Sequence, residues 1–169
     1  ATGATNTIET VSIDTGSVAN SLADLQTTGV GATTLEITGN TALTISTALD
    51  DEITTVSAGS LTAGLTATVG AGGVAITTGS GADNITGSTG ADTIVTGDGN
   101  DSVVSTAGGV DVLTLGGGDD EVTSANTLAA TDTATGGEGT DTLNFGANAA
   151  DLTGLTLVSG FEVVETNGA

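Results

Sequence analysis

Apolar residues along this chain alternate with polar ones in short runs. Before residue 78, Thr, Val and Ile alternate with polar residues in five segments, which cover residues 7–14, 33–39, 42–47, 53–59 and 65–70. Alternating β-branched residues bounded by Gly, Asn and Asp predict short strands with one buried face. Only residues 17–26 have a sequence that fits a helical turn, so the pattern predicts an all-β chain.

From residue 78 onward the apolar positions follow a repeat. Seven aspartates recur, mostly nine residues apart: Asp83, Asp92, Asp101, Asp111, Asp120, Asp132 and Asp141. An apolar residue stands two positions after each of them: Ile85, Ile94, Val103, Leu113, Val122, Ala134 and Leu143. A polar–apolar–polar triplet is a very short strand with one buried side chain. One turn and one such strand make half a coil, so two units of about 18 residues in all complete a solenoid coil.

Glycines precede most of these aspartates at fixed spacing. Glycine accepts positive φ, which allows tight G-x-G turns whose carbonyl groups remain open to a ligand. Calcium takes about 6–8 oxygen ligands and mixes carboxylates with main-chain carbonyls. The pattern therefore predicts calcium sites. Their candidate ligands are the seven aspartates and the glycines Gly79, Gly81, Gly90, Gly97, Gly99, Gly109, Gly118, Gly137 and Gly139.

Four segments carry a resemblance to a known family. They are TGSGADNIT (78–86), GSTGADTIV (87–95), TGDGNDSVV (96–104) and GGEGTDTLN (136–144). They resemble the nonapeptide G-G-x-G-x-D-x-U-x of RTX (repeats-in-toxin) proteins, in which U is a large apolar residue. The resemblance implies a right-handed parallel β-solenoid, the RTX β-roll, with calcium ions between stacked glycine-rich turns. Thr78, Thr96 and Ser88 replace motif glycines. The three residues before Asp132 are Ala129, Ala130 and Thr131, without a glycine, which makes Asp132 the weakest candidate.

Alternate units should share an edge of the solenoid. Asp83, Asp101, Asp120 and Asp141 are then expected to stack on one edge, and Asp92, Asp111 and Asp132 on the other. One ion between successive turns of each edge gives about five calcium ions. We expect three regions. Residues 1–77 form a Thr/Val-rich solenoid without a regular metal motif, residues 78–145 form the calcium-binding β-roll, and residues 146–169 form a β coil, a cap or a junction to a next repeat.

Two details extend this prediction beyond the repeats. Residues 69–77 fit the nine-residue frame, with Val74 where Asp would stand and Ile76 at the buried position. Residues 7–11 and 160–164 resemble each other, which suggests one period of a longer array.

The residue types that the chain lacks exclude several classes of function. The chain has no Lys, Arg, His, Cys, Met, Trp, Tyr or Pro, and its 21 carboxylates give a net charge of -21. The chain therefore lacks most of the side chains that general acid–base and nucleophilic catalysis use, so we do not expect it to be an enzyme. Nucleic acid is excluded as a partner because phosphate binding rests on Lys and Arg. No run approaches the ~20 apolar residues of a membrane-spanning helix. Self-repulsion opposes compaction, so a cation is expected to enter the fold.

The resemblance implies a role outside the cell. We expect a calcium-dependent structural protein that is secreted to a bacterial cell surface or extracellular matrix. It would self-associate as a segment of a surface layer, matrix or filament. Three alternatives stay open: an RTX adhesin segment that binds a surface polysaccharide, the RTX tail of a secreted hydrolase whose catalytic domain lies elsewhere, and an ice-binding Thr array.

Overall fold

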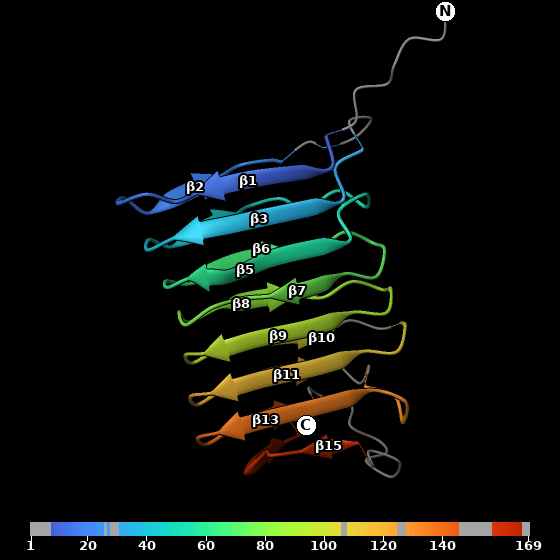
Figure 1. The fold of residues 1–169 in the computed structure, drawn as a ribbon. Coiled ribbons are helices and arrows are strands. Elements are labelled where there is room, and N and C mark those ends of the chain that lie inside the picture. The colour runs from blue at the N-terminus through green and yellow to red at the C-terminus, as the bar shows by residue number, and fades with distance from the viewer. Residues whose placement is uncertain are drawn as a thin grey trace, which may run out of the picture.

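The chain winds into a solenoid with two parallel sheets, each of eight strands (Figure 1). The computed structural model describes residues 8–25, 27, 31–105, 108–124, 128–145 and 157–166. Over these residues the chain forms strands and turns and no helix, which confirms the all-β prediction. No described segment has the length and apolarity that a helix needs to cross a membrane.

Odd-numbered strands form the first sheet and even-numbered strands form the second. The first sheet contains β1 (Thr10–Asp14), β3 (Thr34–Gly39), β5 (Thr55–Leu61), β7 (Ala75–Thr77), β9 (Thr93–Asp98), β11 (Val112–Gly117), β13 (Thr133–Glu138) and β15 (Val158–Ser159). The second contains β2 (Asn20–Leu22), β4 (Leu43–Ile45), β6 (Leu65–Thr68), β8 (Asn84–Thr86), β10 (Ser102–Ser105), β12 (Glu121–Ser124), β14 (Thr142–Asn144) and β16 (Val163–Glu165). Because every strand pairs in parallel with the strand two places along the chain, each coil stacks directly on the previous one (Figure 1).

The strand register confirms a coil of two nonapeptides. Ser102 pairs with Asn84, 18 residues earlier, and with Glu121, 19 residues later. The apolar residue of each unit lies in one of two buried ladders. Ile76, Ile94, Leu113 and Ala134 line the first sheet, and Ile85, Val103, Val122 and Leu143 line the second. These ladders form the core between the sheets.

The apolar content of the core changes along the solenoid. Among the described residues, the stretch 32–76 buries fifteen apolar side chains. The described residues within 97–141 bury five apolar side chains, together with five aspartates. Apolar burial is the main favourable term in folding, so the later coils need another source of cohesion.

The expected helical turn at residues 17–26 is wrong. Asn20–Leu22 form β2 and pair with β4, and the Asn20 amide donates to the Ala42 carbonyl at 2.9 Å. Leu22 is half-buried and packs against the core. A helix this short is marginal in water, so sheet pairing and burial of Leu22 decide the conformation.

Candidate metal centre

Two columns of buried aspartates follow the turns that connect the sheets. The first aspartate column (Asp83, Asp101, Asp120, Asp141) lies in turns that lead from the first sheet to the second. The second aspartate column (Asp92, Asp111, Asp132) lies in turns that lead back. Each of the seven side chains is at most 3% exposed. The structure thus brings the predicted residues together in the order that their spacing suggested.

Main-chain hydrogen bonds hold each column in register. The Oδ1 atom of each aspartate accepts the amide of the residue one coil earlier. In the first column, the amides of Asp83 and Asp101 donate to Asp101 and Asp120 at 2.8 Å, and the Asp120 amide donates to Asp141 at 3.0 Å. In the second column, Asp92 donates to Asp111 and Asp111 to Asp132, both at 3.0 Å. One carboxylate oxygen of each of these acceptors is therefore satisfied within the protein.

The other carboxylate oxygen is not satisfied at three positions. The Oδ2 atoms of Asp101, Asp120 and Asp141 are buried without a hydrogen-bond partner, and they are the only such side-chain atoms in the described part of the chain. The Thr96 hydroxyl, which stands near the start of the Asp101 turn, donates to the Leu115 carbonyl at 2.9 Å. It also lies near enough to Asp101 to oppose part of the rise in that carboxyl's pKa, which burial causes. A buried anionic oxygen without a donor is costly. These three atoms are thus suited to a cation.

The same three aspartates end turns of one shared geometry. Both glycines of each G-x-G have positive φ: Gly97 and Gly99, Gly116 and Gly118, and Gly137 and Gly139. A Cβ on Gly118 would lie 1.8 Å from the Gly99 oxygen, and one on Gly139 would lie 2.0 Å from the Gly118 oxygen. Glycine carbonyls therefore face the next coil. Carboxylate and carbonyl oxygens are the ligands that calcium prefers, so these residues fit the ion.

Three other predicted glycines serve a different purpose. Gly79, Gly81 and Gly90 are absent from the glycines with positive φ, so a left-handed turn does not explain them. A Cβ at these positions would lie 1.8 Å from the Leu61 oxygen, 2.1 Å from the Ala63 carbonyl carbon and 2.2 Å from the Gly73 nitrogen, respectively. Close approach of adjacent backbones requires glycine there. Gly109 combines both reasons, with φ of 78° and a Cβ 2.4 Å from the Gly90 oxygen.

One member of the first column was missed in the sequence. Glu162 takes the place of aspartate in the last described coil, where its Oε2 accepts the Asp141 amide at 2.9 Å. Gly160 stands two residues before it, with φ of 71°, and Val164 stands two residues after it. The spacing G-x-E-x-U was the available signal.

Carboxylates alone do not form a metal site here. Among the described residues, no group of three or more His, Cys, Asp or Glu side chains lies close enough to hold an ion. A calcium site here would therefore need oxygen ligands besides the carboxylates, and the glycine carbonyls of the turns are the candidates. Exposed Asp98, Asp119 and Glu138 lie on the three turns that end in Asp101, Asp120 and Asp141, and add negative potential that attracts cations.

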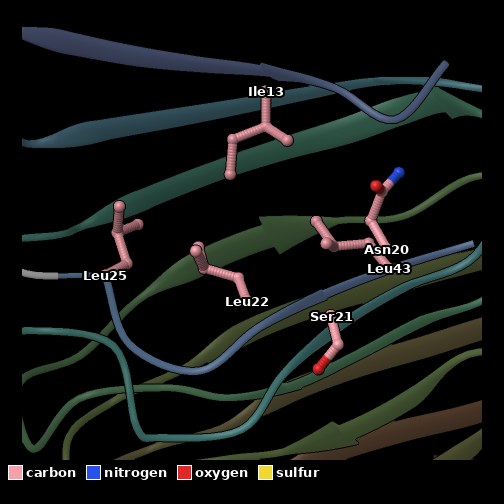
Figure 2. Close-up of a pocket in the computed structure, with 6 residues that line it drawn as sticks. All are labelled: Ile13, Asn20, Ser21, Leu22, Leu25 and Leu43. Carbon is pink, nitrogen blue, oxygen red and sulfur yellow. The ribbon is translucent and has the colours of Figure 1, made fainter.

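A pocket of about 330 Å³ lies at the end of the solenoid that β1 and β2 form (Figure 1). Figure 2 shows the side chains that line it. It is lined by Ile13, Asn20, Ser21, Leu22, Leu25 and Leu43. Its lining is mostly apolar and contains no charged side chain, so it has neither a metal ligand set nor a general acid or base.

Burial changes the acidity of the columns. Burial raises the pKa of both Asp83 and Asp120 to about 6, although main-chain amide donors partly oppose the shift. Burial also raises the pKa of Asp101 and Asp111. Neighbouring carboxylates add to the rise: Asp98 of the same turn acts on Asp101, and the column neighbours Asp92 and Asp132 act on Asp111. At neutral pH these groups are buried as anions at a cost to the fold.

Acidification is expected to stabilise the calcium-free chain. A carboxyl whose pKa is higher in the folded state binds its proton more tightly there than in the unfolded chain. Its contribution is complete below about pH 4 and is lost as the pH rises through about 6. Thermal unfolding in calcium-free buffer, followed by circular dichroism, should give a higher midpoint at about pH 4.5 than at about pH 7.5. Asp120→Asn should show a smaller gain, and a midpoint that falls on acidification would contradict the prediction.

Comparison with known families agrees with this geometry. Residues 77–109, 103–126 and 125–149 match the family model described as RTX calcium-binding nonapeptide repeat (4 copies). No curated protein and no solved structure matches the chain. The family match covers the coils that contain both aspartate columns and the positive-φ glycine turns. Residues 77–149 of the chain are therefore RTX-type calcium-binding nonapeptide repeats.

Proposed function

We propose that this chain is an extracellular, non-catalytic structural segment whose repeat coils fold and stiffen when calcium binds. The observation that carries the proposal is the set of buried, unpartnered Oδ2 atoms of Asp101, Asp120 and Asp141, which stack in one column. A bound calcium ion would supply the positive charge that these buried oxygens lack within the protein. RTX repeat proteins are typically secreted by bacteria, and millimolar calcium outside cells suits weak sites of about 10⁻⁴–10⁻³ M.

The chain's own residues provide the frame for this coupling. The column amides set the spacing of the carboxylates, and the glycine turns bring carbonyl oxygens of adjacent coils together. Without the cation, the buried anions repel one another and the small core of residues 97–141 does not offset chain entropy. Binding free energy then becomes folding free energy.

Self-association into a surface layer or filament is the role we assign to the folded solenoid. The net charge of -21 prevents close approach of two copies unless cations bridge their carboxylates. Exposed Asp98, Asp119 and Glu138 offer such carboxylates on one edge. Binding of a surface polysaccharide has less support. Sugar stacking uses aromatic rings, and of the two Phe residues Phe145 is buried.

Electron microscopy tests this role directly. In about 10 mM calcium we expect sheets or filaments, because this concentration exceeds the Kd of weak extracellular sites. Excess chelator should disperse them, and restored calcium should rebuild them. Equal magnesium is the control, since magnesium dehydrates reluctantly and requires octahedral sites. Single copies in every condition would overturn the assembly role.

A further inference from the structure

The two aspartate columns differ in how their second carboxylate oxygen is satisfied. In the second column every Oδ2 accepts a hydrogen bond from the protein. The Ser88 amide donates to Asp92 at 2.7 Å, the Ala129 amide donates to Asp132 at 2.6 Å, and the Ser105 hydroxyl donates to Asp111 at 3.4 Å. In the first column, Asp101, Asp120 and Asp141 have no such donor.

Departures from the nonapeptide motif produce this difference. Ser88 stands where the motif has its second glycine, and its hydroxyl also donates to Asp92 Oδ1 at 3.0 Å. Ala129 stands near the start of a turn without a G-x-G, and its amide donates to the second oxygen of Asp132. We call a carboxylate closed when both of its oxygens accept a hydrogen bond from the protein, and open when its Oδ2 has no donor. A hydroxyl or amide that donates a hydrogen bond stabilises the buried carboxylate anion, so that less stabilisation by a cation is required. The substitutions thus do within the protein what an ion would do.

Backbone geometry separates the columns in the same way. The three open carboxylates end the turns at residues 97–101, 116–120 and 137–141, whose G-x-G glycines all have positive φ. In the turn before Asp111 the positive-φ glycines are adjacent, Gly108 and Gly109, and Gly90 before Asp92 has no positive φ. Thr78, which also replaces a motif glycine, donates its hydroxyl to Asp83 Oδ2, so the first turn of the first column is closed as well.

We infer that calcium binding is confined to one edge of this solenoid, at Asp101, Asp120 and Asp141, and that the second aspartate column is held by the protein alone. The inference rests on the calcium role proposed above and restricts it. It assigns about three ions, one to each open carboxylate, in place of the five that the motif count suggested. The protein then has one metal-dependent edge and one metal-independent edge.

Asp120→Asn and Asp111→Asn form a matched pair for the test. Both residues lie inside a column, accept an aspartate amide from the previous coil and donate an amide to the next aspartate. Asparagine keeps the Oδ1 acceptor and removes the charge. Native mass spectrometry of the full chain in calcium should count about three ions in the parent, about three in Asp111→Asn and at most about two in Asp120→Asn. Isothermal titration should show the same loss of calcium uptake.

The outcomes separate this inference from the proposed function. Equal losses from both variants, or five ions in the parent, would overturn the single-edge assignment and leave calcium binding intact. No calcium uptake by the parent chain would overturn the calcium role itself. Should either variant fail to fold in calcium, Asp101→Asn and Asp92→Asn repeat the comparison one coil earlier. There, the Asp92 carboxylate is closed by Ser88, and the Asp101 carboxylate is open.

Discussion

Chelation of calcium at neutral pH is expected to unfold the coils within residues 97–141 and to leave the coils of residues 32–76 folded. Among the residues that the structure describes, the early coils bury fifteen apolar side chains, whereas the later stretch buries five beside five aspartates. At calcium ten times above Kd, each ion adds about 1.4 kcal/mol of stability. Three ions therefore add about 4 kcal/mol, which is a large part of a domain stability of about 5–15 kcal/mol. Removing them should take the later coils below the folding threshold.

Hydrogen exchange with peptide-level mass analysis measures this result. Amides of β9 to β14 should lose protection when chelator is added, and amides of β3 to β6 should keep it. Equal magnesium should not restore protection, which separates coordination from general charge screening. Full protection of β9 to β14 in chelator would show that these coils need no ion. Loss of protection throughout would show that the solenoid folds as one unit.

In calcium, Gly118→Ala is expected to destabilise the chain by about 3 kcal/mol or more. Gly118 has φ of 133°, a region that side-chain-bearing residues rarely enter, and its added Cβ would lie 1.8 Å from the Gly99 oxygen. That oxygen belongs to the backbone of the adjacent coil, so the turn must open to admit the methyl group. Thermal unfolding in calcium should show a large fall in midpoint, and titration should show lost calcium uptake.

Gly117→Ala is the matched control one residue earlier. Gly117 has no positive φ, and its added Cβ would lie 3.4 Å from a side-chain oxygen of Asp98, an ordinary contact. Its effect on stability should stay within about 0.5 kcal/mol. Similar unfolding midpoints for the two variants would show that the turn at Gly118 can move away from the Gly99 carbonyl at little cost in stability.

Regular spacing made the aspartate columns predictable from the sequence. An aspartate every nine residues, followed two positions later by an apolar residue, places alternate units on the same edge of any two-sheet coil. Ile94 and Leu113 therefore lie in one ladder, and Ile85 and Val103 lie in the other. Val74 was also placed correctly: it is buried where aspartate would stand, and its amide donates to Asp92 Oδ1 at 2.9 Å.

Local contacts set the limits of that prediction. Spacing shows where Ser88 stands, but only the folded turn shows that its amide and hydroxyl close the Asp92 carboxylate. Glu162 was missed because it is a glutamate where the nonapeptide motif has aspartate. The helical turn expected at residues 17–26 failed because neighbouring strands, which lie far away in sequence, decide the conformation of β2.

Both aspartate columns begin next to apolar coils, and this gives the folding of the solenoid a direction. The Leu65 amide donates to Asp83 Oδ1 at 2.6 Å, as the Val74 amide does to Asp92, so residues of the hydrophobic coils provide the first donors of each column. A preformed stack spares the acidic coils the entropic cost of starting a new one, since in a solenoid each repeat contacts only its neighbours. The acidic coils can then fold one after another, starting from the amino-terminal side, where the apolar coils are already folded.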